Sequence, residues 1–461
     1  MPNKNKFLKF LLLIGDIFLL YASLLLVLAI RYGDFSFWPG PQTKVFLFHF
    51  SFLAFFWIVI LYIFDFYEIP PLKKVFDFCG NLLIFIFLAS VFGTTYFYLR
   101  PEVAIAPKTI LILDVLIFSF FLGFWRYIFS RILRMAKGGE KIVIIGFQPG
   151  LEELVNNNLI SGANYEILAF FSPENSFLEK LFPFATQAKY GVVSDIKKLK
   201  KIIEKEKVET VVFPHFLPGN EQLINLVFAN LPLKLNYISF ADFYENLTKK
   251  VAIETVNEAW FLANISRPEK KVDDILKRGF DILFSFVWLL VTVILFPFVA
   301  FAIKIDSSGP VLYTQKRIGR DGRTFTLYKF RTMVKNAEQN GPQWAQPNDP
   351  RITMVGKVLR KLYLDEFPQF FNILRGDISF VGPRPERPEF VNQLKNEIPY
   401  YDIRHIIKPG LTGWAQINYP ASTSVEEAKE KFKYDLYYIK NRNFFMDLGI
   451  ILKTIKLIFR Q

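Results

Sequence analysis

The sequence predicts a membrane protein with a helical membrane region, then an α/β domain with a parallel sheet, then a mixed α/β domain. Hydrophobic residues make up 52% of the 461 residues, and phenylalanine alone accounts for 53. Long apolar runs fill the first part, short β-branched runs alternate with polar stretches in the middle, and a further apolar run contains Pro297. We therefore divide the chain into 1–135, 136–265 and 266–461.

Composition narrows the class of partner. The net charge is +14, which suits nucleic acid, anionic lipid or phosphorylated substrates. The apolar runs favour lipid headgroups and phosphates over nucleic acid. Cys79 is the single cysteine, which excludes a disulfide framework and a thiolate metal site. His49, His215 and His405 are far apart in the sequence, so we expect any metal to be a hard cation held by oxygen atoms.

The first region contains four apolar runs, each close to the roughly 20 residues that a helix needs to cross a bilayer. We predict four transmembrane helices at Phe7–Ile30, Val45–Phe64, Leu82–Leu99 and Ile110–Ile128. Basic residues gather before the first run, after the second (Lys73, Lys74) and after the fourth (Arg131 to Lys141, with Lys137 between). The positive-inside rule therefore places both ends of this region in the cytoplasm.

Three acidic residues, Asp16, Asp65 and Asp114, lie in or beside the predicted spans. Such residues indicate a polar site within the membrane by default. Helix-end placement or a hydrogen bond between helices also explains them, and we favour that interpretation.

The middle region alternates strands and helices. "KIVIIGF", "YEILAFF", "VETVVFP" and "KLNYISF" are typical of strands, and "SDIKKLKKIIEKEK" of an amphipathic helix. This order predicts a doubly wound, Rossmann-like domain. Its first turn, Gly146 to Gly150, departs from the G-x-G-x-x-G pattern of dinucleotide sites, and Pro149 has no amide proton. We favour a domain without a ligand over a nucleotide-binding one.

A fifth apolar run, about 272–305, has the length of a membrane span, with Pro297 inside it and basic residues on both sides. A crossing helix would place those basic residues on opposite sides of the membrane. We therefore predict a re-entrant helix that bends at Pro297 and returns to the cytoplasmic side. The last helix, "FFMDLGIILKTIKLIFRQ", is compatible with either a lipid-surface helix or a buried domain helix.

The last region pairs two adjacent carboxylates, Asp365 and Glu366, with many basic residues. One carboxylate could serve as nucleophile or metal ligand and the other as a base or orienting group. Arginines held by proline-rich loops suit phosphate, so the set favours diphosphate chemistry over glycoside hydrolysis. A purely structural role also remains open, in which the pair caps a helix and binds Arg360 and Lys361.

The same region resembles a known family. "KRGFDI", "DSSGPVLYTQKRIGRDGRTFTLYKFRTM", "LDEFPQFFNILRGDISFVGPRPE", "KPGLTGWAQIN" and "YDLYYIKNRNFFMDLGIILKTI" are similar to the bacterial sugar transferases. These are the polyprenyl-phosphate hexose-1-phosphate transferases, or monotopic phosphoglycosyl transferases. With four predicted spans and a Rossmann-like domain, the architecture resembles the large undecaprenyl-phosphate galactose or glucose phosphotransferases of exopolysaccharide systems.

The resemblance implies a reaction. A hexose-1-phosphate passes from a UDP-sugar to undecaprenyl (polyprenyl) phosphate, and UMP is released, as the first membrane step of exopolysaccharide, capsule or O-antigen synthesis. Asp365 would attack the sugar-bearing phosphorus to give a phosphosugar–aspartyl intermediate, and Glu366 would deprotonate or orient the polyprenyl phosphate. The resemblance also implies Mg²⁺ with Asp365 as a ligand, and a catalytic domain on the cytoplasmic face of the inner membrane.

Further positions match family motifs. Arg360, Arg384, Lys329 and Arg331 would bind substrate, and Pro383 and Pro385 would shape the active-site wall. The chain departs from the family at Phe296-Pro297, where Ser-Pro is usual. It departs again at Tyr419-Pro420, where many members have Gly-Arg. The second departure leaves the sugar undetermined.

Two other functions compete with this hypothesis. A membrane-anchored nucleotide-sugar dehydratase needs Tyr-x-x-x-Lys, and none of the 20 tyrosines has lysine four positions later. A non-enzymatic scaffold of a polysaccharide assembly complex would not need the acid pair. The sequence does not determine the sugar, the pathway, a ligand of the middle domain or the oligomeric state, although extra domains are compatible with a homodimer.

Overall fold

The computed structural model describes most of the chain and divides it into two compact units, Met1–Gly138 and Gly139–Gln461. The described residues are 2–33, 41–68, 75–100, 108–135, 139–163, 165–172, 182–214, 235–265, 271–337, 339, 341, 349–419 and 424–460. Lys73, Lys74, Lys137, His215 and Pro420, which the sequence analysis singled out, lie outside them.

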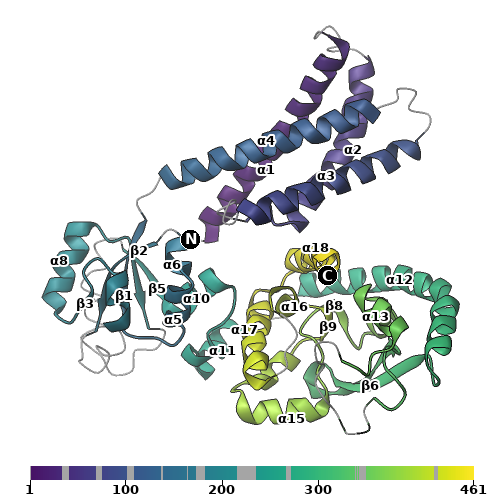
Figure 1. Cartoon of the computed structure of the whole chain (residues 1–461). Coiled ribbons are helices and arrows are strands. Elements are labelled where there is room, and N and C mark those ends of the chain that lie inside the picture. Colours follow the sequence, from purple (N-terminus) through teal and green to yellow (C-terminus); the bar gives the residue numbers. More distant parts are fainter. Residues whose placement is uncertain are drawn as a thin grey trace. The chain divides into compact units, whose positions relative to one another are not determined.

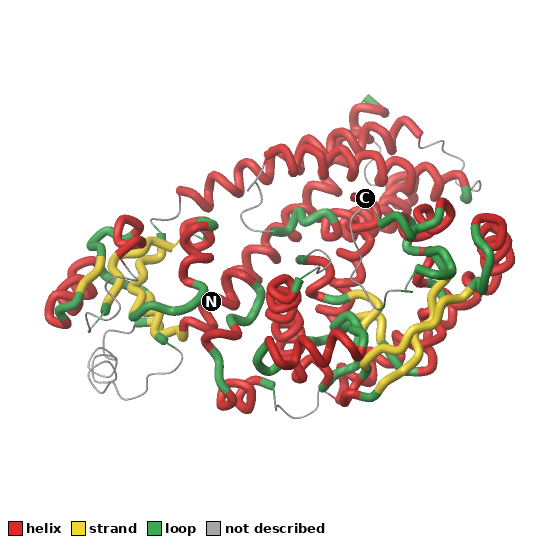
Figure 2. Tube along the Cα trace, turned by 60° about the horizontal axis from the view of Figure 1, so that its bottom comes forward, coloured by secondary structure: helices red, strands yellow, loops and turns green. Residues whose placement is uncertain are grey.

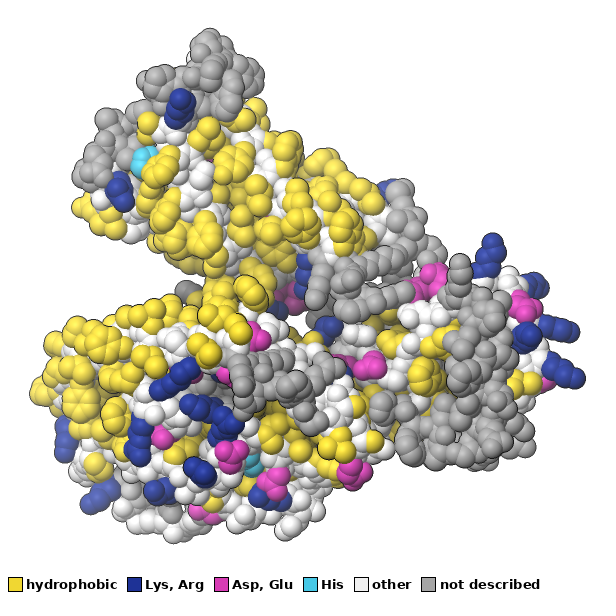
Figure 3. Space-filling model, turned by 180° about the vertical axis from the view of Figure 1, so that it is seen from behind, with side chains coloured by type: hydrophobic (Ala, Val, Ile, Leu, Met, Phe, Trp, Pro, Cys, Tyr) yellow, Lys and Arg dark blue, Asp and Glu magenta, His cyan; other side chains and the backbone are white. Residues whose placement is uncertain are grey.

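The first unit consists, in its described part, of long apolar helices (Figure 1). These are α1 (Pro2–Tyr32), α2 (Pro41–Ile63), α3 (Val75–Tyr98) and α4 (Lys108–Met135). Each is long and apolar enough to cross a membrane. Figure 3 shows hydrophobic side chains over much of the outer surface of this unit, where Phe48, Phe87 and Phe120 are well exposed. An apolar exterior of this kind suits lipid and indicates a membrane protein.

Two predicted acidic residues make hydrogen bonds between helices of this unit. Asp16 accepts two hydrogen bonds from the Arg126 guanidinium, at 2.8 and 2.6 Å, and both side chains are fully buried. Asp114 accepts one from the Ser23 hydroxyl at 2.6 Å. These pairs join α1 to α4, so the interhelical interpretation is confirmed for Asp16 and Asp114. Asp65 lies in the turn after α2 with a positive φ of 63°.

The second unit begins with a five-stranded parallel sheet in the order β3-β2-β1-β4-β5, shown in yellow in Figure 2. Its strands are β1 (Glu140–Ile145), β2 (Tyr165–Phe171), β3 (Val192–Val193), β4 (Thr210–Phe213) and β5 (Asn236–Ser239). The four strands that we predicted are confirmed, and β3 was missed because two residues are too short to show a pattern. The strand order is that of a Rossmann-like sheet.

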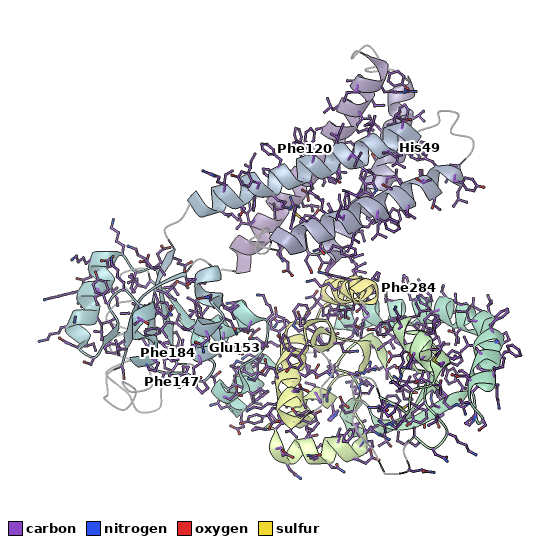
Figure 4. The ribbon with its side chains drawn as sticks, viewed as in Figure 1. His49, Phe120, Phe147, Glu153, Phe184 and Phe284 are labelled. Atoms are coloured by element: carbon purple, nitrogen blue, oxygen red, sulfur yellow. The ribbon has the colours of Figure 1, made fainter. Side chains whose placement is uncertain are left out.

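Helices cover both faces of this sheet because alternate side chains of β1 point to opposite sides. Ile142 and Ile144 pack with α5 (Leu151–Asn156) and α10 (Phe240–Thr248) in one cluster. Val143 and Ile145 pack with α8 (Ile196–Glu206), the predicted amphipathic helix, in the other. Figure 4 labels Phe147 and Phe184 beside the first cluster.

The turn between β1 and α5 is shaped by glycines with positive φ, 71° at Gly146 and 93° at Gly150. The first turn of α5 carries Glu152 and Glu153. Glu153 forms an ion pair with Lys250. The absence of a nucleotide from this domain stays a prediction from the sequence.

The C-terminal part of the second unit combines helices with two small sheets. The antiparallel hairpin pairs β6 (Leu312–Ile318) with β7 (Thr324–Phe330), and a parallel pair joins β8 (Ser379–Val381) to β9 (Gly410–Thr412). The helices are α12 (Lys271–Asp306), α13 (Met354–Lys361), α14 (Gln369–Arg375), α15 (Pro388–Glu397), α16 (Trp414–Asn418), α17 (Val425–Asn441) and α18 (Phe444–Arg460). Leu327, Ile373, Phe380 and Ile450 share one core.

Helix α12 is the fifth helix long and apolar enough to cross a membrane. It continues through Pro297 rather than ending there, and Figure 1 shows it change direction along its length. Near its start, Lys277 Nζ donates to Val381 O at 2.8 Å. At its end, Asp306 Oδ2 accepts from the amide of Val355 at 2.8 Å. Both ends are therefore bonded to the same folded domain, while Val293, Phe298 and other side chains between them are exposed.

Helix α18 packs along β8 and β9, as a domain helix would. Ile450 is buried in the core, and the Thr454 and Thr412 hydroxyls are 2.7 Å apart. Phe445 is largely exposed on the opposite side. One face of the helix thus belongs to the domain, and the other remains available to lipid.

The Rossmann-like part packs against α17. Lys250, which is almost fully buried, forms ion pairs with Glu153 of α5 and Glu430 of α17. Figure 4 labels Glu153 on the side of its domain that faces α17. Trp260 and Phe261, from α11 (Glu258–Asn264), share a hydrophobic cluster with α15 and α17. Burial of large side chains on both sides makes this a substantial contact within the unit.

Candidate active site

The acid pair lies in a sharp turn between two helices. Asp365 and Glu366 occupy a 3₁₀ turn, Leu364–Glu366, between α13 and α14. Tyr363 precedes it with a positive φ of 54°, and Pro368 stands just before α14. The chain here is helical on both sides of the turn, in α13 and α14. The pair occupies the turn itself, where both carboxylates face the domain interior, and Asp365 is 8% exposed.

Glu366 is held by two cations from distant parts of the sequence. Its Oε1 accepts hydrogen bonds from Lys329 Nζ and from Arg384 Nη2, each at 2.7 Å. Lys329 comes from β7, and Arg384 from the loop after β8. Although burial by itself opposes ionisation, Arg384 and Lys329 hold the pKa of Glu366 well below its usual range. Glu366 is therefore a fixed anion.

Asp365 differs from Glu366 in its hydrogen bonds and in the direction of its pKa shift. Its carboxylate accepts no hydrogen bond from the part of the chain that the structure describes. Burial raises its pKa above the usual range; Lys329 opposes the shift, while the charge of Glu366 adds to it. A buried carboxylate next to cations, with oxygen atoms not committed to a neighbour, is suited to attack an electrophile or to bind a cation.

The loop that carries Arg384 is fixed by backbone contacts. Gly410 N donates to Pro383 O at 2.9 Å, and Arg317 Nη1 donates to Pro385 O at 3.0 Å. A Cβ on Gly410 would lie 2.0 Å from the backbone of Gly382, so the close approach of these two segments requires glycine. The two prolines thus sit on either side of an arginine whose backbone cannot easily move.

Two other predicted substrate-binding residues, Arg360 and Arg331, make different contacts. Arg360 donates from Nε to Thr332 Oγ1 at 2.9 Å and contributes to the charge around Asp365. Arg331 donates instead to the carbonyl groups of Ser307 and Ser308, at 2.7 and 3.0 Å. Its guanidinium therefore fastens the end of α12 rather than facing the acid pair. Glu366 pairs with Lys329 and Arg384 rather than with Arg360 and Lys361 as suggested.

A second group of charges lies behind Arg384 and was not predicted. Arg404 Nη2 donates to Arg384 O at 2.9 Å and to Asp435 Oδ2 at 3.0 Å. Arg317 lies 3.6 Å from Glu386. Lys431 and Asp435 belong to α17. Their i, i+4 spacing next to Phe432 and Leu436 was a signal that one face of α17 buries charge.

The chemistry of the pair suits a divalent cation that is shared with a substrate. No group of three or more His, Cys, Asp or Glu side chains gathers to hold a metal among the described residues. Mg²⁺ characteristically uses one or two carboxylates and completes its shell with water and phosphate oxygens. The uncommitted Asp365 carboxylate fits this requirement, whereas Glu366 is already bound to Lys329 and Arg384.

Comparisons with known proteins support one family. Residues 272–461 match the family described as Bacterial sugar transferase. The "Uncharacterized sugar transferase EpsL" of Bacillus subtilis (strain 168) is 40% identical over 186 residues, which cover 40% of this chain and 86% of that protein. The chain belongs to the bacterial sugar transferase family.

Larger relatives carry names that describe an activity. The "UDP-N-acetylgalactosamine-undecaprenyl-phosphate N-acetylgalactosaminephosphotransferase" of Aeromonas hydrophila is 44% identical over 214 residues, 46% of this chain and 50% of that protein. The "UDP-glucose:undecaprenyl-phosphate glucose-1-phosphate transferase" of Escherichia coli (strain K12) is 37% identical over 205 residues, 44% of each chain. The match thus spans half or less of these two relatives.

Proposed function

We propose that this protein transfers a hexose-1-phosphate from a UDP-sugar to undecaprenyl phosphate and releases UMP. The observation that carries the proposal is the buried Asp365 carboxylate, without a hydrogen bond from the described residues, beside a Glu366 that fixes Lys329 and Arg384. The names of the relatives supply the substrate classes. By the same analogy, the reaction would begin the membrane stage of exopolysaccharide, capsule or O-antigen synthesis.

In the first step, an Asp365 oxygen attacks the phosphorus that bears the sugar. A bond forms between that oxygen and phosphorus, and the bond from phosphorus to the bridging oxygen of UMP breaks, so the electron pair leaves with UMP. Lys329 and Arg384 lie beside the attacking group, where they stabilise the negative charge that develops on the phosphate oxygens. The product is a phosphosugar–aspartyl intermediate.

In the second step, a phosphate oxygen of undecaprenyl phosphate attacks the same phosphorus and releases Asp365. A phosphate monoester is largely doubly ionised at neutral pH, so its attack does not require a general base. Glu366, whose pKa is lowered by Arg384 and Lys329 despite its burial, is also poorly suited to accept a proton. We therefore assign Glu366 to orienting the two cations rather than to deprotonating the acceptor.

We further propose that the Asp365 carboxylate would contribute a ligand to Mg²⁺ when the substrate is bound. A bound divalent cation would reduce the repulsion between an anionic nucleophile and an anionic diphosphate. The residues of this chain position the reacting groups and exclude water around them.

We propose that α1 to α4 span the inner membrane and that α12 is re-entrant, which places the acid pair on the cytoplasmic face. The supporting observation is that Lys277 and Asp306, near opposite ends of α12, bond to the same domain. A straight helix of 36 residues would be about 54 Å long and would separate its ends by more than a bilayer core. At the membrane surface, the soluble UDP-sugar and the lipid-bound undecaprenyl phosphate can both reach the acid pair.

The reaction is tested by UMP release from a panel of UDP-sugars by the full-length protein in lipid nanodiscs with undecaprenyl phosphate and Mg²⁺. We expect release with at least one sugar, and an Asp365→Asn variant should lose roughly 10³-fold or more in rate, because the amide is not a nucleophile. Asp321→Asn is the matched control, since Asp321 is an exposed acid in the β6–β7 turn.

The intermediate is tested by intact-mass measurement after incubation with the active donor alone. The wild-type protein should gain the mass of one phosphosugar, and the Asp365→Asn protein should not. UMP release at the wild-type rate by Asp365→Asn would refute the assigned role. A requirement for both substrates before any UMP appears would refute the two-step order.

The topology is tested with a reactive tag inserted after Arg320, in the β6–β7 turn. We expect an impermeant reagent to label the tag only after cells are opened, and a tag in the loop after α1 to be labelled in intact cells. Labelling of the Arg320 tag from outside intact cells would rule out the re-entrant arrangement.

A further inference from the structure

Lys431 is a buried cation that the proposed reaction has not yet used. It lies on α17, is 7% exposed, and makes neither a hydrogen bond nor an ion pair with a described residue. Burial lowers the pKa of its ammonium group. An ammonium group on a largely buried side chain is costly unless a partner compensates it. Since no described residue forms an ion pair with Lys431, a bound anion would compensate its charge.

The carboxylates near Lys431 already have arginine partners. Glu386 and Asp435 are the two anions whose charge Lys431 senses, and Arg384 and Arg404 are the neighbouring cations. Glu386 lies 3.6 Å from Arg317, and Asp435 accepts from Arg404 at 3.0 Å. Lys431 is therefore the surplus positive charge of this group, and an anion that enters from solution would balance it.

The surplus charge is connected to the acid pair. Arg404 donates to the carbonyl of Arg384, and the Arg384 side chain donates to Glu366. Arg384 also senses the charge of Glu386, Glu366 and Asp365. Lys431 lies about one helical turn before Asp435 on α17, and Asp435 is the residue that Arg404 binds. The contacts from Asp435 through Arg404 and Arg384 to Glu366 therefore connect this part of α17 to the acid pair.

The outer face of α17 indicates which substrate reaches Lys431. Glu430 and Lys433, on either side of Lys431 in the sequence, pair with Lys250 and Glu254 of the Rossmann-like part. This segment of α17 is therefore packed against a water-soluble domain rather than exposed as an apolar surface. A soluble donor is the better fit than the head group of a lipid.

We propose that Lys431 is a substrate-binding residue that receives a phosphate group, and that this group is the phosphate of the UDP-sugar that leaves as part of UMP. The inference rests on the proposed function, because it assigns a residue to the donor of that reaction. It adds a contact to the leaving group, distinct from the Lys329 and Arg384 contacts beside the nucleophile.

The test compares Lys431→Met, Lys431→Arg and the control Lys429→Met in the full-length protein. Lys429 is on the same helix but is more exposed and pairs with Glu254 at 2.9 Å. Because one charged hydrogen bond is removed, we expect Lys431→Met to raise the KM for the donor by roughly 10- to 100-fold. The KM for undecaprenyl phosphate should change less than about threefold. Lys431→Arg should recover part of the loss, and Lys429→Met should resemble the wild type.

Binding of UMP itself, measured by calorimetry, gives a readout that does not depend on turnover. Lys431→Met should weaken UMP binding while thermal stability stays equal or rises, since a buried charge has been replaced by an apolar group of similar size. A parallel loss of stability and of donor affinity would overturn the inference in favour of a structural role. A rise in KM for undecaprenyl phosphate alone would overturn the assignment to the donor.

Failure of this inference can be distinguished from failure of the proposed function. If the wild type releases UMP and Lys431→Met has an unchanged donor KM and an unchanged UMP affinity, Lys431 is not a phosphate ligand, although the function stands. If the wild type releases no UMP from any donor but binds UMP in a manner that depends on Lys431, the inference is supported and the function is not.

Discussion

The membrane unit and the active site both bury charged side chains, but they do so in different ways. In the membrane unit, Arg126 and Asp16 are fully buried and satisfy each other through two hydrogen bonds. At the active site, Glu366 accepts hydrogen bonds from two cations, whereas Asp365 and Lys431 form neither a hydrogen bond nor an ion pair with a described residue. The charges of the membrane pair are balanced by each other. At the active site, a bound ligand is needed to balance Asp365 and Lys431.

The difference separates structural from functional charge. A buried pair that is balanced and fully hydrogen-bonded stabilises the arrangement of its helices, because the loss of either partner leaves a charge in an apolar medium. An unbalanced group is retained at a cost in stability, which is expected where binding or chemistry supplies the missing partner. Mutation at the active site should therefore lower activity most, whereas mutation of the membrane pair should lower stability and leave activity per folded molecule unchanged.

After Asp365→Asn, the largest effect on activity is expected from Glu366→Gln at the active site. The amide is a weaker acceptor and carries no charge, so Lys329 and Arg384 lose the group that orients them. We expect the rate of UMP release per folded molecule to fall by roughly 10²- to 10³-fold. Some stability should be lost as well, because Lys329 and Arg384 lose their counter-charge. Glu389→Gln, an exposed acid at the start of α15, is the control. A Glu366→Gln protein with a wild-type rate would contradict the orienting role.

Mutation of the membrane pair should lower stability and leave the rate of UMP release per folded molecule close to that of the wild type. Asp16→Asn or Arg126→Met alone should lower stability by about 3–5 kcal/mol, since each leaves its partner buried without a counter-charge. The double variant Asp16→Leu/Arg126→Met should recover much of that loss. Thermal unfolding in detergent measures the first effect, and UMP release per folded molecule should be close to wild type. A double variant no more stable than the singles would show that the pair is not an isolated closed unit.

A smaller effect is expected from His405, which is buried and neutral near Arg404. Burial and the Arg404 charge lower its pKa to about 4, from 6.5 in the unfolded chain. Between pH 6.5 and 4 the unfolded chain therefore binds a proton that the folded protein does not, so stability falls as the pH falls through this window. The difference of 2.5 pKa units corresponds to roughly 3 kcal/mol at most.

The measurement is the apparent melting temperature from pH 7 to pH 4. The wild type should lose stability over this range, and His405→Gln should lose less, because the glutamine side chain does not titrate. Equal slopes for the two proteins would show that His405 is not responsible for the acid sensitivity.

Much of the fold followed from the sequence because the signals are local. The apolar runs of α1 to α4 are set by the length that a bilayer requires, and β1, β2, β4 and β5 are set by short β-branched stretches between turns. The acid pair was also evident, since two carboxylates among arginines and prolines are unusual in an apolar chain. The motifs around it resembled one family over most of the last region.

The tertiary structure alone decided which charges meet. Glu366 binds residues 37 positions before it and 18 after it, and no pattern of neighbouring residues specifies such pairs. The same holds for Arg331, which donates to the carbonyl groups of Ser307 and Ser308 at the end of α12, and for Lys431, which the sequence pattern did not single out. The sequence determines which side chains are available and what each segment becomes, because backbone preference and hydropathy act over short distances. Whether a charged side chain is paired within the protein depends on contacts between distant segments. Only the packing of the folded chain brings those segments together.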